Sequence, residues 1–157
     1  MAAPPAPRST LRLARFVPFR LNRLAGAVSQ HLAVIYRGRY GLEVPEWRVL
    51  ASVGERHGCT AQYVAASTAM HKTRVSRAIA QLRRRGLIAR AAAARDRRAL
   101  HLSLTPAGRR LYAQLVPLAL ARERALLQCL SGPQRRAFAA ALARLERALQ
   151  LGEPPPG

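Results

Sequence analysis

Basic side chains are concentrated between His71 and Arg98, where the chain carries ten lysine or arginine residues and one acid, Asp96. Guanidinium and ammonium groups bind phosphate, and a guanidinium also donates to base edges in the major groove of DNA. The segment therefore predicts a surface that binds a polyanion, with nucleic acid as the first candidate. The ten basic residues are Lys72, Arg74, Arg77, Arg83, Arg84, Arg85, Arg90, Arg95, Arg97 and Arg98.

Two short helices are predicted to position this segment. Thr60 can cap a helix over residues 61–68, and a break at residues 68–71 separates it from a second helix that begins near Lys72. Gly86 ends the second helix, because glycine adopts the left-handed conformation that closes many helices. This arrangement is typical of a helix-turn-helix, whose second helix enters the major groove.

The second helix divides into a buried face and a polar face. With 3.6 residues per turn, its apolar side chains fall on one side and anchor it to a core. These are Val75, Ile79 and Leu82. We expect DNA contacts from Lys72, Thr73, Arg74, Ser76 and Arg77. The alternative is an ordinary solvated, charged helix face.

A basic loop between two strands follows this helix. After Gly86 the apolar period changes to two, and Leu100, Leu102 and Leu104 alternate with polar residues. We therefore expect a two-stranded β ribbon, or wing, that reaches the adjacent minor groove, where negative potential attracts arginine. The residues expected at its tip are Arg95, Arg97 and Arg98.

The remaining sequence predicts one mainly α-helical domain. Half of the 157 residues are apolar, which suffices for a core without disulfides or metals. Apolar residues recur at helical spacing, and helix signals occur at Pro45, Thr105 and Ser131. The expected helices cover about 18–36, 45–57 and 106–129, with a last helix after Ser131. We expect mostly disordered ends at 1–16 and 151–157.

Composition excludes several classes of function. The net charge of +20 favours anionic partners, although 26 of the 27 basic residues are arginine and part of this excess can reflect codon composition. No apolar run is long enough to span a bilayer. An arginine-rich transit peptide is the alternative interpretation of the first 42 residues, but the helix that the apolar spacing predicts over about 18–36 disfavours it. We expect a soluble cytoplasmic protein.

Residues for catalysis or metal binding are sparse. Cys59 and Cys129 are far apart and form no CxxC pair, and the four histidines show no ligand spacing. The seven acids form no paired-carboxylate cluster. We therefore expect no metal, no cofactor and no enzyme activity. A redox role for Cys59, activated by His57 or a neighbouring arginine, is a minor alternative.

Three segments together resemble the MarR family of transcriptional regulators. They are PEWRVLA, MHKTRVSRAIAQLRRRGLIAR and RDRRALHLSLTPAGRRL, within a similarity that spans about residues 18–150. The resemblance implies a winged helix-turn-helix over 43–105 and a helical dimerisation domain built from 17–42 and 106–150. It also implies that Asp96 pairs with nearby arginines and orders the wing, while Arg97 or Arg98 enters the minor groove.

The resemblance further implies a mode of regulation. Such proteins are homodimers, so the operator should be a pseudo-palindrome with half-sites roughly 34 Å apart. Many relatives release DNA when a small aromatic acid binds between the dimer stem and the DNA-binding lobe, which implies a ligand-responsive repressor. An arginine would hold the carboxylate and aromatic side chains would pack on the ring. The candidate ligand residues are Arg20, Asn22, Tyr36, Trp47 and Arg48.

Two other nucleic-acid functions stay open. A nonspecific architectural protein would owe its affinity to phosphate contacts and would treat all duplexes alike. Binding of RNA is less favoured, because RNA modules stack bases on exposed aromatic side chains and the few aromatics here fall mostly on predicted core faces.

Overall fold

The computed structural model describes residues 10–92 and 100–151. The described residues form two compact units, which divide between His31 and Leu32. The first unit contains a short 3-10 turn, Leu13–Arg15, and the beginning of helix α1, which spans Val17–Tyr40. Several apolar side chains of this part of α1 are exposed, among them Val17, Leu21 and Leu24. The end of α1 belongs to the second unit, where Ala33 and Tyr36 are buried.

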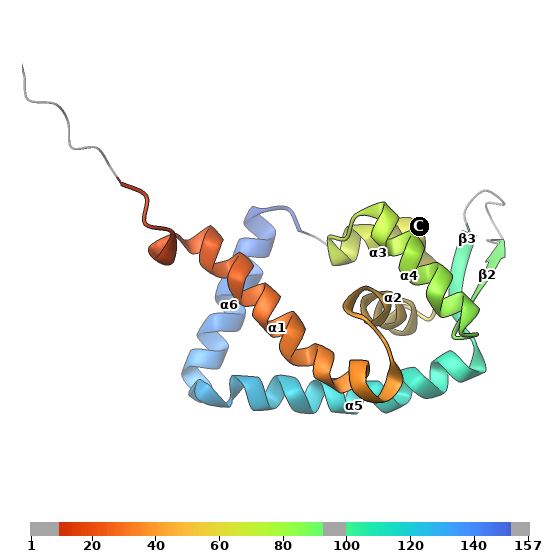
Figure 1. The fold of residues 1–157 in the computed structure, drawn as a ribbon. Coiled ribbons are helices and arrows are strands. Elements are labelled where there is room, and N and C mark those ends of the chain that lie inside the picture. Colours follow the sequence, from red (N-terminus) through yellow and green to blue (C-terminus); the bar gives the residue numbers. More distant parts are fainter. Residues whose placement is uncertain (1–9, 93–99, 152–157) are drawn as a thin grey trace, which may run out of the picture. The chain divides into compact units, whose positions relative to one another are not determined.

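The second unit is mainly α-helical with a small antiparallel sheet, as the sequence predicts (Figure 1). The elements that carry the predicted interface are α2 (Val44–Glu55), β1 (Cys59–Thr60), α3 (Ala61–Thr68), α4 (Lys72–Arg84), β2 (Ile88–Ala92) and β3 (Leu100–Leu104). They are followed by α5 (Pro106–Leu126), a 3-10 turn (Leu127–Cys129) and α6 (Gly132–Ala148). In the part of the chain that the structure describes, no helix is long and apolar enough to cross a membrane.

Local capping residues set the starts of three helices, and all three were predicted. The Thr60 hydroxyl accepts a hydrogen bond from the backbone of Tyr63 (3.1 Å), and Thr105 accepts one from Gly108 (3.0 Å). Ser131 forms a reciprocal capping box with Gln134. Each cap satisfies an amide that has no partner within its helix.

Helix α1 extends beyond its predicted end. The sequence prediction stopped it near Tyr36, before Gly38, but the helix continues through Gly38 to Tyr40. A glycine inside a helix costs only about 1 kcal/mol, which packing can offset. The reversal occurs at Gly41, whose φ of +59° is readily adopted by glycine. Helix α5 likewise runs through Pro117 without ending.

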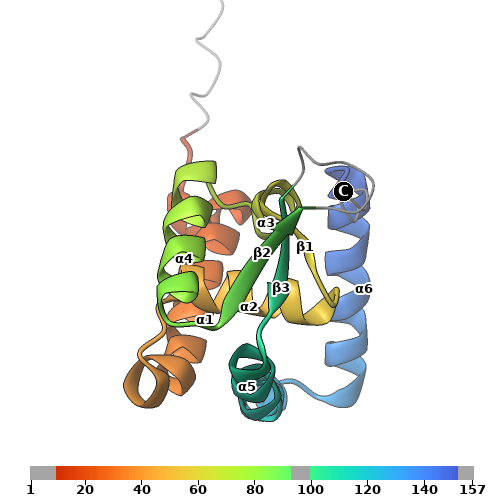
Figure 2. The same ribbon diagram turned by 90° about the vertical axis from the view of Figure 1, so that its right-hand side faces the viewer.

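The wing belongs to a three-stranded sheet in the order β1-β3-β2, rather than to a two-stranded ribbon alone (Figure 2). The predicted pairing of β2 with β3 is present, with Ile88 opposite Leu104. The additional strand, β1, pairs Cys59 with Leu102 and Thr60 with His101. It has only two residues, too few for a periodic apolar pattern to reveal it.

The core of the second unit is centred on α2. Helices α3 and α4 pack against α2, and β3 and α5 contact it as well. The side chains with no exposed surface include Leu50 and Val53 of α2, Val64 of α3, Leu82 of α4 and Leu115 of α5. Burial of each aliphatic side chain of this kind stabilises the fold by about 1.5–3 kcal/mol. This packing gives α4 a fixed support.

Candidate nucleic-acid interface

Helix α4 has one exposed polar side and one buried apolar side. Its predicted anchors are buried, with Val75, Ile79 and Leu82 exposing 1%, 2% and 0% of their surfaces. The opposite side carries the side chains predicted to contact DNA, and all of them are exposed: Lys72, Thr73, Arg74, Ser76 and Arg77. We call these five residues the reading face.

The turn before α4 fixes where the reading face begins. Ala69 ends α3 in the left-handed conformation (φ +52°), and the next residue, Met70, inserts into the core. His71 then caps α4, because its Nδ1 accepts a hydrogen bond from the backbone of Thr73 (3.3 Å). The break predicted at residues 68–71 is therefore a tight turn between two packed helices, as a helix-turn-helix requires.

Helix α3 is held by an aromatic and cationic contact at its first turn. The Arg56 side chain donates a hydrogen bond from Nε to the hydroxyl of Tyr63 (2.9 Å). The same guanidinium lies over the Tyr63 ring, 4.9 Å from its centroid. A cation over an aromatic face is attracted by about 0.5–1 kcal/mol at an exposed site. This contact joins the end of α2 to α3.

The wing extends from the end of α4 and returns to α5. Arg90, on β2 opposite Leu102, is exposed. The three arginines predicted at the wing tip, Arg95, Arg97 and Arg98, and the predicted wing-ordering residue, Asp96, lie outside the described residues. Their minor-groove and loop-ordering roles stay predictions.

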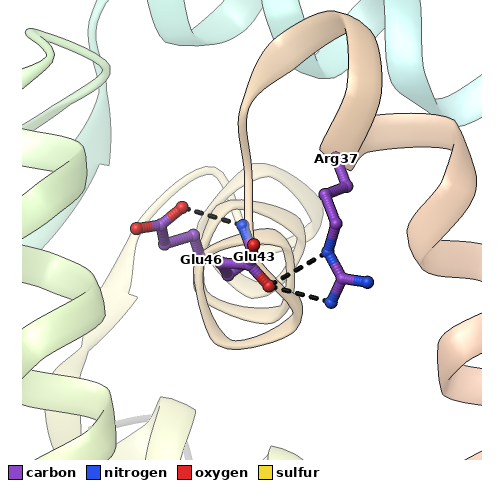
Figure 3. Close-up of polar contacts among 3 residues, drawn as sticks. All are labelled: Arg37, Glu43 and Glu46. Atoms are coloured by element: carbon purple, nitrogen blue, oxygen red, sulfur yellow. Dashed lines mark hydrogen bonds and ion pairs between the residues drawn. The ribbon is translucent and has the colours of Figure 1, made fainter.

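Two carboxylates lie close to the reading face, and sequence reasoning did not single them out. They belong to the α1–α2 corner, residues 37–46, where Glu43 accepts two hydrogen bonds from Arg37 (2.8 and 3.1 Å; Figure 3). The backbone of Glu43 donates to Glu46 (2.9 Å), which caps α2. A hollow of about 200 Å³ is lined by Glu43, Pro45, Glu46, Arg74, Arg77, Ala78 and Gln81.

The hollow places acids near the two arginines of the reading face. The carboxylates lower the positive potential at Arg74 and Arg77 relative to an isolated basic helix. Glu43 is already paired with Arg37, and Glu46 with a backbone amide, so their negative charge is partly offset. No local sequence signal indicates this arrangement, because about thirty positions separate the acids from the arginines.

Arg85 forms a contact that the sequence also did not reveal. It was counted only as part of the basic segment, but its guanidinium donates to the carbonyl oxygens of Tyr40 and Gly41. The partners are 44 and 45 residues away in the sequence. The contact joins the end of α4 to the α1–α2 corner.

Of the residues predicted to bind an effector, Tyr36, Trp47 and Arg48 lie close together in the second unit. The rings of Tyr36 and Trp47 stack with centroids 5.5 Å apart and planes 19° from parallel. Burial raises the pKa of Tyr36, and the nearby charge of Arg48 opposes that rise. Arg20 and Asn22 lie in the first unit. A ligand role for these residues stays a prediction.

A separate cavity of about 330 Å³ lies where α2, β3 and α5 meet. It is lined by Val53, Gly54, His57, Ser103, Leu104, Arg109 and Tyr112. Arg109 donates to the carbonyl oxygen of Leu104 (2.7 Å), which leaves further guanidinium donors. The lining combines apolar with hydrogen-bonding side chains, and Arg109 supplies a positive charge, although the carboxylate of Glu55 acts on Tyr112 of the same lining.

Comparisons with known proteins agree with this geometry. A model of the MarR family matches residues 40–99. A MarR family transcriptional regulator from Silicibacter pomeroyi DSS-3 is 30% identical, covers 89% of this chain and 99% of its own, and superposes with a TM-score of 0.77. A probable transcriptional regulator from Pseudomonas aeruginosa is also 30% identical, with 85% and 99% coverage and a TM-score of 0.71.

A third similar structure is the Bordetella bronchiseptica regulator BpsR, whose DNA binding is regulated by 6-hydroxynicotinic acid. It is 25% identical, covers 88% of this chain and 98% of its own, and has a TM-score of 0.72. A comparison with curated protein sequences finds no match. The identity and near-complete coverage of the Silicibacter regulator, together with the matching family model, show that this chain belongs to the MarR family of transcriptional regulators.

Proposed function

We propose that this chain binds DNA sequence-specifically as a homodimer and is a ligand-responsive repressor that recognises a pseudo-palindromic operator. The observation that carries the proposal is the reading face, which is exposed along α4 while the opposite side of the helix is fully buried. A helix supported in this way can hold Arg74, Ser76 and Arg77 against base edges in the major groove. The protein would act in the cytoplasm.

Exposed apolar surface supports self-association. On α6 and at its end, Phe138, Leu142, Leu145 and Leu149 expose between 36% and 68% of their surfaces. On α1, Val17 and Leu24 are more than half exposed. Apolar side chains gathered along one helix in this way are typical of surfaces that a partner covers. Light scattering of the full chain at micromolar concentration should give the mass of a dimer, whereas a monomer would contradict this part of the proposal.

The operator can be sought by selecting bound fragments from randomised duplex DNA at near-physiological salt. Enrichment of one short palindrome would support a dimeric, sequence-specific regulator. Diffuse enrichment that disappears with added salt would favour the alternative function, a nonspecific architectural protein, because phosphate contacts alone give strongly salt-dependent binding.

A substitution in the reading face tests whether Arg77 contributes to operator binding. We expect Arg77→Met to weaken operator binding by about tenfold to a hundredfold, the cost of a lost bidentate base contact. The matched control is Arg110→Met, which removes an exposed arginine on α5, away from the reading face. If both variants bind the operator equally well, Arg77 does not read it.

The effector is expected to be a small aromatic acid. The regulation of BpsR by 6-hydroxynicotinic acid supports this expectation, and so does the cavity beside Arg109, whose lining combines apolar side chains with a guanidinium. Titration of the protein–operator complex with hydroxybenzoates and hydroxynicotinates should release DNA, as measured by fluorescence anisotropy. Arg109→Met should abolish the response if the cavity is the site, and Arg48→Met should abolish it if the Tyr36–Trp47 region is the site. Release by no compound in the panel would leave a repressor without this class of effector.

A further inference from the structure

Three consecutive arginines end helix α4, and within the described residues only the side chain of the last has a hydrogen-bond partner. The side chains of Arg83 and Arg84 form no hydrogen bond or ion pair there, and both residues are exposed. Arg85, the C-cap, donates from Nη1 to Gly41 (2.9 Å) and from Nη2 to Tyr40 (2.5 Å). The three side chains therefore have the same charge but different surroundings.

The two acceptors lie at the end of α1. The chain leaves the helix at Gly41, whose amide bonds to Arg37 (3.0 Å), and the amide of Leu42 bonds to Tyr36 (3.1 Å). After this reversal the carbonyl oxygens of Tyr40 and Gly41 have no amide partner within α1. They also lie at the negative end of the helix dipole, so a guanidinium with two parallel donors complements them in charge and in geometry.

Apolar packing alone defines the position of α4 along its axis less well than directional hydrogen bonds do. The buried contacts of Val75, Ile79 and Leu82 are strong but not directional. The two hydrogen bonds of Arg85 are directional and charge-assisted, and they act at the end of α4 opposite to the first turn of the reading face. They fix this end against the α1–α2 corner, which the Arg37–Glu43 ion pair also holds.

We propose that Arg85 is a positioning residue that sets the orientation of the reading face and thereby the spacing of the half-sites that a dimer accepts. This inference rests on the proposed function. Arg85 acts through the carbonyl oxygens of Tyr40 and Gly41 and does not itself contact DNA. A dimer binds two half-sites about one helical turn apart, so a small tilt or slide of each α4 changes the separation that fits best.

The test compares Arg85→Met with Arg84→Met, since each removes one charge from the end of α4. Binding of the full-length variants is measured on the selected operator and on operators whose half-sites are one base pair closer or farther apart. For Arg85→Met we expect the affinity for the operator with native spacing to fall about tenfold, which corresponds to the loss of charge-assisted hydrogen bonds. The affinity for the operators with altered spacing should fall less. Arg84→Met should lower binding equally on all three operators or not at all.

Salt dependence separates positioning from a phosphate contact. Loss of one phosphate contact reduces the slope of log affinity against log salt by about 0.9. Arg85→Met should keep the wild-type slope. A reduced slope with an unchanged spacing preference would identify Arg85 as a phosphate contact and overturn the proposal. Arg85→Lys keeps the charge but not the two-donor fork, so it should retain the slope and still broaden the spacing preference.

A measurement without DNA keeps the proposal testable if a variant is unstable or the operator proves nonspecific. Amide hydrogen exchange of residues 37–42 should be faster in Arg85→Met and Arg85→Lys than in Arg84→Met. Equal exchange in all variants would overturn the inference. If the wild-type protein shows no spacing preference, the proposed function fails and the inference fails with it. If the wild type shows one and Arg85→Met keeps it, only the inference fails.

Discussion

The hydroxyl group of Thr105 donates a hydrogen bond to the carbonyl oxygen of Gly86, and their oxygen atoms are 2.6 Å apart. The same hydroxyl accepts from the backbone of Gly108 as the cap of α5, and the Thr105 amide donates to Leu87. One side chain therefore joins the end of α4, the base of the wing and the first turn of α5.

Thr105→Val should destabilise the fold by about 1–2 kcal/mol. The substitution keeps the shape of the side chain but removes both the helix cap and the bond to Gly86. Urea unfolding monitored by circular dichroism measures the change. Thr105→Ser keeps the hydroxyl and should recover most of the loss; a serine variant as unstable as the valine variant would show that the hydroxyl is not responsible.

Gly108→Ala should be more damaging than its size suggests. A Cβ atom at this position would lie only 1.9 Å from the carbonyl oxygen of Leu87, so α5 and the wing base would have to separate. We expect a loss of more than about 2 kcal/mol in thermal or urea unfolding. The control is Gly38→Ala inside α1, where a Cβ meets nothing within 4 Å and should stabilise by about 0.5–1 kcal/mol. Equal effects at both glycines would contradict this close approach.

Ala69→Gly should stabilise the turn of the helix-turn-helix by up to about 1 kcal/mol. Ala69 has a φ of +52°, a conformation that costs a residue with a Cβ roughly 1–2 kcal/mol, which exceeds the entropic cost of glycine. The control, Ala66→Gly within α3, should destabilise by about 1 kcal/mol. Thermal melting of both variants tests the difference, and a destabilised Ala69→Gly would show that the turn is not strained.

The Cys59 thiol should be unreactive in the folded protein. Burial raises the pKa of Cys59 from 9.0 to about 11, although the charge of Arg56 opposes the rise. Little thiolate therefore forms at neutral or mildly alkaline pH. Mass spectrometry after brief alkylation should show modification at the exposed Cys129 and almost none at Cys59. Rapid alkylation of Cys59 would contradict this prediction and favour the alternative, a redox role for Cys59.

The same shift makes stability depend on pH. Because the folded state disfavours the thiolate, the contribution of Cys59 is complete below the unfolded pKa and is lost as the pH rises toward about 11. Urea midpoints should fall over this alkaline range, and Cys59→Ser should fall less. An identical decline in both proteins would assign the effect to other groups.

Features encoded by neighbouring residues were predictable, and those that depend on distant contacts were not. The caps at Thr60 and Thr105 and the division of α4 into two faces follow from residues within one or two helical turns. The predicted end of α1 was wrong, because the sequence signal at Gly38 indicates a helix end while packing around Ala33 and Tyr36 favours a longer helix. The base contacts of the reading face remain predictions.

The candidate interface shows the same division. The polar side chains of α4 were identified from their spacing, since a helix of 3.6 residues per turn fixes which of them share a side. The contact of Arg85 with Gly41 spans 44 residues and depends on the fold as a whole. Glu43 and Glu46 approach Arg74 and Arg77 only because α2 packs against α4.

The two-residue strand β1 makes the wing inseparable from the first helix of the helix-turn-helix. Thr60 pairs with His101 of β3 and, through its hydroxyl, also starts α3. If residues 88–104 were replaced by the hairpin of a relative, the new hairpin would have to pair with the original β1. A mismatch there would disturb the Thr60 cap of α3. An exchange of wings among such regulators should therefore transfer residues 59–60 together with the hairpin, because β1 and β3 are paired and each strand fixes the position of the other.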